Sequence, residues 1–324
     1  MTRSTDFALF NENLSDEKLS REALLGTNIE PSYSGVLSFV RRKYSRDLTH
    51  ADVAVTGIPY DLACTNRPGA RFGPRAIREE SSAINWGTVP HWGFDPFDKL
   101  AVVDYGDCGV DSSHPEKIPD EIEAHISNII NNDCATLTLG GDHFITYPIL
   151  KAYAKKYGKG LSLIHFDAHY DTWNDRAGKI EHGTMFYHAV KEGIINPKNS
   201  VQIGQRTAIE DTLGFNVLDN QWVHEHGVEA VAQRIKDIVG DNLCYLTFDI
   251  DCLDPSFAPG TGTPVIGGLS TYQAQRILRG IEGINVIGMD VVEVAPAYDH
   301  GAITALAGAS LGLDMLCLFA TKLK

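Results

Sequence analysis

Imidazole and carboxylate side chains gather in four short motifs, each of which follows an apolar run of the sequence. The motifs are GGDH (140–143), DAHYD (167–171), DIDCLDP (249–255) and DVVEVAP (290–296). From the first three we select six candidate metal ligands: His143, Asp167, His169, Asp171, Asp249 and Asp251. Oxygen-rich sites with a few imidazoles suit Mn²⁺, whereas structural zinc prefers thiolate and imidazole. We therefore interpret these six residues as a candidate manganese site.

The number of carboxylates indicates how many ions the site would hold. Its four aspartates carry four negative charges, which two divalent cations would balance. A single ion would leave a buried excess of negative charge, which is costly in free energy. We therefore expect two Mn²⁺ ions per chain. Cys252 lies beside Asp251, and we expect its side chain to point away from the ions.

The spacing of the ligands predicts how they come together. Side chains alternate along a strand, so Asp167, His169 and Asp171 should project to one side as their strand ends. The same alternation should place Asp249 beside Asp251. Ligand sites of open parallel sheets lie at the carboxyl ends of the strands, so the four motifs should converge there. His165 precedes this group inside the strand, and we expect it to be buried or to support a ligand.

The elements that carry these motifs predict an α/β protein. Short apolar runs alternate with amphipathic segments, which is typical of a parallel sheet with helices on both faces. We expect a single domain with three layers, since no linker or internal repeat divides the sequence. The expected strands are 52–59, 99–107, 135–142, 161–169, 200–206, 243–251 and 284–294, and two clear helices are 228–240 and 271–283.

The first part of the chain lacks this regular alternation. Residues 1–48 are mostly polar, with one apolar patch at 35–40. We interpret them as an N-terminal extension with a short helix that packs on a neighbouring subunit, and 49–324 as the catalytic domain. The six cysteines form no C-x-x-C pair and lie mostly in apolar runs, which favours a reducing compartment.

The charge of the chain restricts its partners. A formal net charge of −14 argues against nucleic acid and anionic membranes, both of which bind clustered Lys and Arg. We found no apolar stretch long enough to cross a bilayer and no signal peptide, so we expect a cytoplasmic protein.

Longer stretches of the sequence resemble a known family. GGDH (140–143), HFDAHYDT (165–172), EHGTMF (181–186), FDIDCLDPSFAPGTGTPVIGGL (248–269) and GMDVVEVAPAYD (288–299) are similar to the ureohydrolases, the family of arginases and agmatinases, and most of all to agmatinases. The resemblance runs from about Gly57 to the C-terminus. It implies an arginase-like fold, a binuclear manganese centre, a small guanidino substrate and a homo-oligomer, either a trimer or a hexamer.

The resemblance also implies roles for individual residues. One ion would be held by His143, Asp167, Asp171 and Asp249, and the other by Asp167, His169, Asp249 and Asp251. Asp167 and Asp249 would then bridge both ions. The catalytic residues implied are Asp171 as proton relay, His182 as proton shuttle and Glu293 as partner of the substrate guanidinium. Thr261, Gly262 and Thr263 would shape the wall of the site.

Several alternatives stay open at this point. The substrate could be agmatine, cleaved to putrescine and urea, or 4-guanidinobutyrate or 3-guanidinopropionate, whose tails are acidic. The loop 173–181 contains both acidic residues and Arg176 and Lys179, so its charge does not decide between them. Glu293 could instead pair with Arg71 or Arg75. A deacetylase with one zinc ion is a rival from another class, and a non-catalytic homologue is a third.

Overall fold

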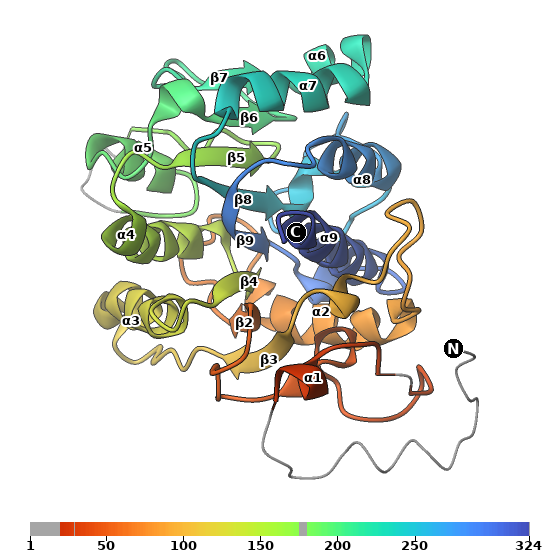
Figure 1. The fold of residues 1–324 in the computed structure, drawn as a ribbon. Helices are drawn as coiled ribbons and strands as arrows, with labels where there is room; N and C mark the ends of the chain where they lie inside the picture. Colours follow the sequence, from red (N-terminus) through yellow and green to blue (C-terminus); the bar gives the residue numbers. More distant parts are fainter. Residues whose placement is uncertain (1–19, 29, 175–179, 324) are drawn as a thin grey trace.

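The computed structural model describes residues 20–28, 30–174 and 180–323. In this part of the chain, nine parallel strands form one sheet that lies between two layers of helices (Figure 1). The strands are β1 Lys43–Tyr44, β2 Val53–Ile58, β3 Val102–Asp107, β4 Ala135–Gly140, β5 Ser162–Phe166, β6 Val201–Ile203, β7 Asn216–Leu218, β8 Cys244–Asp249 and β9 Val286–Val292. The expected three-layer α/β fold is confirmed.

Each of the seven predicted strands matches one observed strand. The two strands that the sequence did not predict are β1 and β7, which have two and three residues and are too short to show a hydrophobic pattern. They are the two edge strands of the sheet, whose order is β1-β3-β2-β4-β9-β8-β5-β6-β7. The observed β5 ends at Phe166, three residues earlier than expected.

Both faces of the sheet bury apolar side chains of helices. One core includes residues of α2 Gly73–Ser81, α7 Val228–Val239, α8 Thr271–Gly280 and α9 Ile303–Ala320. The other includes residues of α3 Ile118–Ile130, α4 Thr146–Tyr157 and α5 Met185–Lys191. The predicted helices 228–240 and 271–283 are α7 and α8. The remaining α-helices are α1 Arg21–Leu24 and α6 Asn220–His226.

Short 3-10 helices occupy many of the connections. They are η2 Phe39–Arg41, η3 Ala70–Phe72, η4 Ser82–Ile84, η5 Pro96–Asp98, η6 Pro115–Lys117, η7 His143–Ile145, η8 Pro197–Asn199, η9 Ile250–Cys252 and η10 Pro296–Tyr298. Two of them, η7 and η9, come directly after β4 and β8 and carry predicted metal ligands.

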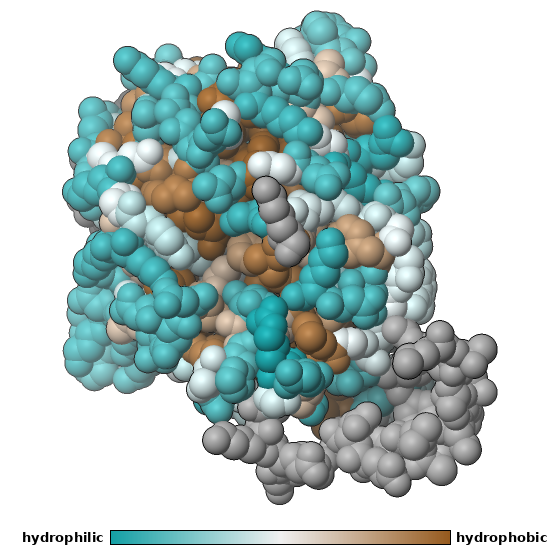
Figure 2. All heavy atoms as spheres, viewed as in Figure 1, coloured by the Kyte–Doolittle hydropathy of each residue, from teal (hydrophilic) through white to brown (hydrophobic). Residues whose placement is uncertain are grey.

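Helix α9 explains the most apolar stretch of the sequence. By length and composition it could cross a membrane, but 78% of it is buried inside the fold. Its side chains belong to the core between the sheet and α2 and α8. The face of the molecule in Figure 2 is mainly hydrophilic, and apolar side chains show between the helices. The apolar character of α9 therefore reflects packing inside the domain.

Part of the predicted N-terminal extension belongs to this domain. Phe39 is fully buried, and its backbone N–H donates to Asp104 Oδ2 at 2.8 Å. Strand β1 adds an edge to the sheet by pairing with β3. The domain therefore includes residues before 49, and the expected boundary at 48 does not coincide with the start of the core. Packing of the extension on another subunit stays a prediction.

Replacing Phe39 with alanine tests whether this segment stabilises the domain. The ring lies against Gly312 of α9, where an added Cβ would meet Phe39 Cζ at 3.1 Å. We expect Phe39→Ala to lower the free energy of unfolding by about 3–5 kcal/mol, measured by chemical denaturation. Tyr33→Ala is the control, because Tyr33 is 89% exposed. Equal stability of both variants would show that the segment is dispensable.

Candidate metal centre

The four motifs converge because their strands are neighbours in register. Strands β4, β9, β8 and β5 are consecutive in the sheet. Phe166 pairs with Phe248, so Asp167 and Asp249 follow the same level of two adjacent strands. One strand further, Asp249 pairs with Val292, the residue before Glu293. The carboxyl ends of parallel strands share one edge, and this edge collects all four motifs.

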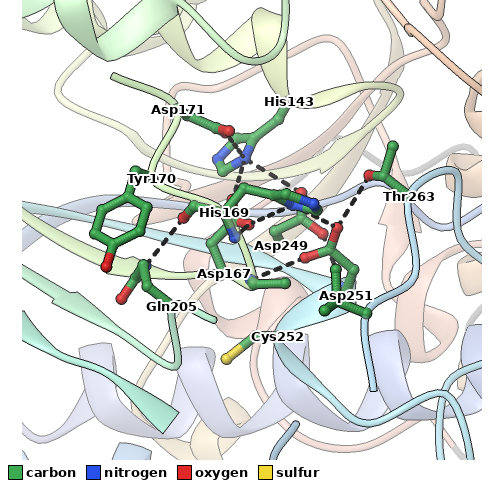
Figure 3. Close-up of polar contacts among 12 residues, drawn as sticks. His143, Asp167, His169, Tyr170, Asp171, Gln205, Asp249, Asp251, Cys252 and Thr263 are labelled. Carbon is green, nitrogen blue, oxygen red and sulfur yellow. Dashed lines mark hydrogen bonds and ion pairs between the residues drawn. The ribbon is translucent and has the colours of Figure 1, made fainter. Parts of the chain in front are cut away.

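His143 is the centre of the first group of candidate ligands. Its Nδ1 lies 3.0 Å from Asp167 Oδ2, 3.0 Å from Asp171 Oδ2 and 3.3 Å from Asp249 Oδ2. All four side chains are at most 4% exposed. Figure 3 shows the three carboxylates pointing toward the His143 ring.

The opposite side of the His143 ring determines which nitrogen faces these carboxylates. Thr247 Oγ1 donates to Asp290 Oδ1 at 2.6 Å and therefore accepts from His143 Nε2 at 2.8 Å. Nε2 therefore carries a proton, and the neutral ring would present the lone pair of Nδ1 to the carboxylates. Buried Nδ1 makes no hydrogen bond, although three anionic oxygens surround it. A lone pair and carboxylates directed at one point form a site for a cation.

The second group contains Asp167, His169 and Asp251, whose ligand atoms lie within 4.8 Å of one another. His169 Nδ1 is 3.2 Å from Asp167 Oδ1 and 3.1 Å from Asp251 Oδ2. Asp251 Oδ2 also accepts from Thr263 Oγ1 at 3.2 Å, and its Oδ1 accepts from the Ala168 amide at 3.0 Å. These bonds direct the Asp251 carboxylate toward His169.

Asp167 belongs to both groups, with Oδ2 on the side of His143 and Oδ1 on the side of His169. The cluster is therefore compatible with a binuclear metal site in which Asp167 is shared. Asp249 contacts His143, but its other oxygen accepts from the Asp251 amide at 2.8 Å. Bridging by Asp249 stays a prediction. Cys252 Sγ lies 3.5 Å from the Ile203 carbonyl and points away from the carboxylates, as expected (Figure 3).

His165 supports Asp167 from behind. Gln202 Nε2 donates to the Tyr170 carbonyl at 2.7 Å, which orients its amide, and it lies 3.0 Å from His165 Nδ1. Nδ1 is therefore the acceptor, and Nε2 donates to Asp167 Oδ2 at 2.8 Å. His165 is fully buried, and these hydrogen bonds agree with the supporting position that we expected for it.

Strand alternation is not what brings Asp167, His169 and Asp171 together. Strand β5 ends at Phe166, so all three lie in the following loop. His169 joins the second group, whereas Asp171 joins the first. Asp171 has a left-handed backbone, with φ of 53°, which lets the loop turn back toward His143. The prediction that strand alternation places these three side chains on one side is therefore wrong, because the segment that carries them is a loop.

Burial and crowding shift the pKa values of these groups strongly. Burial and the neighbouring Asp167 raise the pKa of Asp171 to about 7. Burial also raises the pKa of Asp249 well above its usual range, assisted by Asp251 and Asp167. Burial would lower the pKa of His169, but Asp251 and Asp167 raise it to about 12. Each shift reflects uncompensated negative charge, which bound cations would neutralise.

His182 and Glu293 meet at the side of this cluster. His182 Nδ1 lies 2.9 Å from Glu293 Oε1, and the same oxygen accepts from the His143 amide at 2.9 Å. Glu293 Oε2 is buried and has no hydrogen-bond partner among the described residues. Arg71, which we considered as a partner for Glu293, pairs with Asp61 instead.

A cavity of about 310 Å³ opens over these groups. Its walls are formed by Thr65, His169, Asp171, Trp173, Glu181, His182, Gly183, Asp249 and Thr263. Sequence reasoning did not select Thr65, which contacts His182 from a loop 117 positions earlier in the chain. Arg176 and Lys179 of the loop 173–181 lie outside the described residues.

Comparison with known proteins agrees with this architecture. The arginase family model matches residues 51–317. The chain is 56% identical to an agmatinase from Chromobacterium violaceum over 95% of this chain and 96% of that protein. A crystal structure of a hypothetical agmatinase from Burkholderia thailandensis is 59% identical, with a TM-score of 0.91 over 92% of this chain and 95% of that one. Proclavaminate amidino hydrolase from Streptomyces clavuligerus is 37% identical, with a TM-score of 0.86 over 90% and 99%.

The sheet and its helices thus form an arginase-like α/β fold with a cluster of His and Asp side chains that could hold metal, and the chain belongs to the arginase family. Within that family it is an enzyme of the ureohydrolase class. The family and the fold that the sequence resembled are confirmed.

Asp249→Asn tests whether the carboxylates hold metal. The substitution removes one negative charge from the site, so we expect bound manganese and activity to be lost together. Metal per chain, measured by plasma emission spectroscopy, checks the first and urea release the second. Asp133→Asn is the control, because the Asp133 side chain is 93% exposed. Two retained ions with the full rate would remove Asp249 from the site.

Thr247→Val tests the support of His143 separately. Valine has the shape of threonine but cannot accept the His143 Nε2–H, so the ring loses its fixed orientation. We expect the affinity for the ion beside His143 to fall about 10–100-fold. The ion beside His169 and Asp251 is the internal control and should be retained, as measured by metal titration. This role would be contradicted if the affinity for both ions fell equally, or if the affinity for neither ion changed.

Proposed function

We propose that this enzyme hydrolyses agmatine to putrescine and urea with two Mn²⁺ ions bound by His143, Asp167, His169, Asp171, Asp249 and Asp251. The observation that supports it most is the position of His143 Nδ1, which three buried carboxylates surround beneath an open cavity. Similarity to agmatinases over nearly the whole chain supports the choice of reaction. Ligands that are mostly oxygen, with two imidazoles, suit manganese.

The residues around the cluster supply what the reaction needs from the protein. Bound manganese ions would lower the pKa of a water molecule toward about 7 and so provide the nucleophile. Glu293 Oε2, buried and without a partner, can accept a guanidinium N–H. Asp171 faces the cavity and can take up the proton that the attacking water gives up. His182 can return a proton to the nitrogen that leaves.

The charge of the cavity wall supports a cationic tail. Bound cations would balance the charges of the candidate ligands Asp171 and Asp249, which leaves Glu181 as the acidic side chain of the described wall, and neither Lys nor Arg is among its residues. The Glu181 side chain is exposed, so its carboxylate is accessible to a molecule in the cavity. An ammonium tail would find a partner there, whereas a carboxylate tail would be repelled.

The rival functions that we considered from the sequence have less support. An acidic tail, as in 4-guanidinobutyrate or 3-guanidinopropionate, would depend on Arg176 and Lys179, and the described wall offers it no Lys or Arg. A deacetylase with one zinc ion would not need two ligand groups that share Asp167. The cluster of the two groups therefore favours a binuclear hydrolase.

We also propose that the enzyme is a cytoplasmic homo-oligomer, a trimer or a hexamer. All six cysteines are unpaired, which supports a reducing compartment. Large apolar side chains are exposed around the first turn of α9 and the start of α2, where Phe72, Ile303 and Leu306 are at least 36% exposed. Exposed apolar side chains are typical of surfaces that bind another chain.

Urea release from a panel of guanidino compounds tests the substrate. We expect kcat/KM for agmatine to exceed that for 4-guanidinobutyrate and 3-guanidinopropionate by tenfold or more, about 1.4 kcal/mol of transition-state binding. Glu181→Gln should narrow this ratio, since it removes the charge that the ammonium tail would contact. A preference for either acid, or no urea from any compound, would show that agmatine is not the substrate.

A further inference from the structure

The loop 60–67 reaches over the cavity and is fixed on both sides of Thr65. The Ala63 amide donates to Asp142 Oδ2 at 2.9 Å, and Asn66 Nδ2 donates to the Gly262 carbonyl at 3.1 Å. The start of the loop lies so close to Gly141 that a Cβ there would stand 1.8 Å from the Tyr60 carbonyl oxygen. Thr65 is therefore held in place by contacts on both sides of it.

Thr65 makes two contacts with a single nitrogen of His182. Its backbone N–H points at Nε2 from 3.1 Å, and its hydroxyl oxygen Oγ1 lies 2.7 Å from the same atom. The amide can donate only when Nε2 carries no proton. The hydroxyl oxygen can accept only when Nε2 is protonated. Thr65 thus offers a partner to both forms of the imidazole, and no side chain has to move between them.

The other nitrogen of His182 is held by Glu293. Burial would lower the pKa of His182, but the hydrogen bond and the charge of Glu293 raise it to about 9. The Thr65 amide acts in the opposite sense, because it favours the neutral ring. Glu293 therefore favours the charged imidazolium, which carries a proton on both nitrogens. The Thr65 amide stabilises the neutral ring after the Nε2 proton has left.

Thr65 and His182 both line the cavity, so the hydroxyl is in reach of a molecule bound there. We propose that the Thr65 hydroxyl passes the proton from Nε2 of His182 to the nitrogen that leaves the guanidino carbon. This inference rests on the proposed hydrolysis of a guanidino compound. It assigns a part in the reaction to a residue that lies 117 positions before His182.

The proposed step conserves atoms and charge. As the carbon–nitrogen bond breaks, its electron pair stays on the leaving nitrogen, which takes the proton of the Thr65 hydroxyl. Thr65 Oγ1 takes the proton of His182 Nε2 in the same step, so threonine ends unchanged. The imidazolium becomes neutral, and its Nε2 then accepts from the Thr65 amide. His182 regains a proton from solvent before the next turnover.

The test compares Thr65→Val with Thr65→Ser in the manganese-loaded enzyme with agmatine as substrate. Valine keeps the shape and the backbone amide but has no hydroxyl, whereas serine keeps the hydroxyl. We expect Thr65→Val to lower kcat about 10²–10⁴-fold with little change in KM, and Thr65→Ser to retain most of kcat. Manganese content and thermal stability should stay at the wild-type level in both variants.

The pH profile separates a proton relay from a structural role. The donor is protonated His182, so wild-type kcat should fall as the pH rises through the pKa of His182 in the manganese-loaded enzyme. Thr65→Val should lose this fall of kcat at high pH, and Thr65→Ser should keep it. The relay would be overturned if Thr65→Val kept the wild-type kcat and its fall at high pH, or if both variants lost kcat equally. Wild-type activity would still support the hydrolysis in either case. A wild type that releases no urea from agmatine would refute the proposed function and the relay with it.

Discussion

Four buried carboxylates meet at one edge of the sheet, and the surrounding structure is organised by the negative charge that they concentrate. Asp167, Asp171, Asp249 and Asp251 are each at most 4% exposed. Without cations, carboxylates this close cannot all stay ionised, and burial and mutual repulsion raise the pKa of Asp171 and Asp249. Two divalent cations would remove this conflict, which is the physical reason to regard the cluster as a binuclear metal site.

Two separate hydrogen-bond chains orient the ligands for those cations. Asp290 and Thr247 leave the Nδ1 lone pair of His143 facing the carboxylates. Gln202 and His165 hold Asp167, the residue that both ligand groups share. Such supporting contacts fix ligand geometry before a metal binds, so less conformational entropy is lost on binding. Each hydrogen-bond chain joins two neighbouring strands, β9 to β8 and β6 to β5, so the sheet itself sets its geometry.

His182, the proton donor that we propose, lies beside the carboxylate cluster and contacts Glu293. One oxygen of the Glu293 carboxylate accepts from both His182 and the His143 amide, which connects His182 to a candidate metal ligand. The backbone of Glu293 is left-handed, with φ of 65°, directly after β9. Strained backbone at a strand end often serves a functional site, and here it places a buried carboxylate between the His182 imidazole and the His143 backbone amide.

The sequence by itself determined the fold class, the family and the identity of the clustered side chains. Apolar runs predict strands because burial is encoded in short stretches, and β1 and β7 escaped prediction because they are too short to carry a pattern. Only the tertiary structure decided how the residues face one another. The split of Asp171 and His169 between two groups follows from a loop that turns at a left-handed residue, not from strand alternation. The contact of Thr65 with His182 and the tautomers of His143 and His165 depend on partners far apart in the chain, which no local pattern encodes.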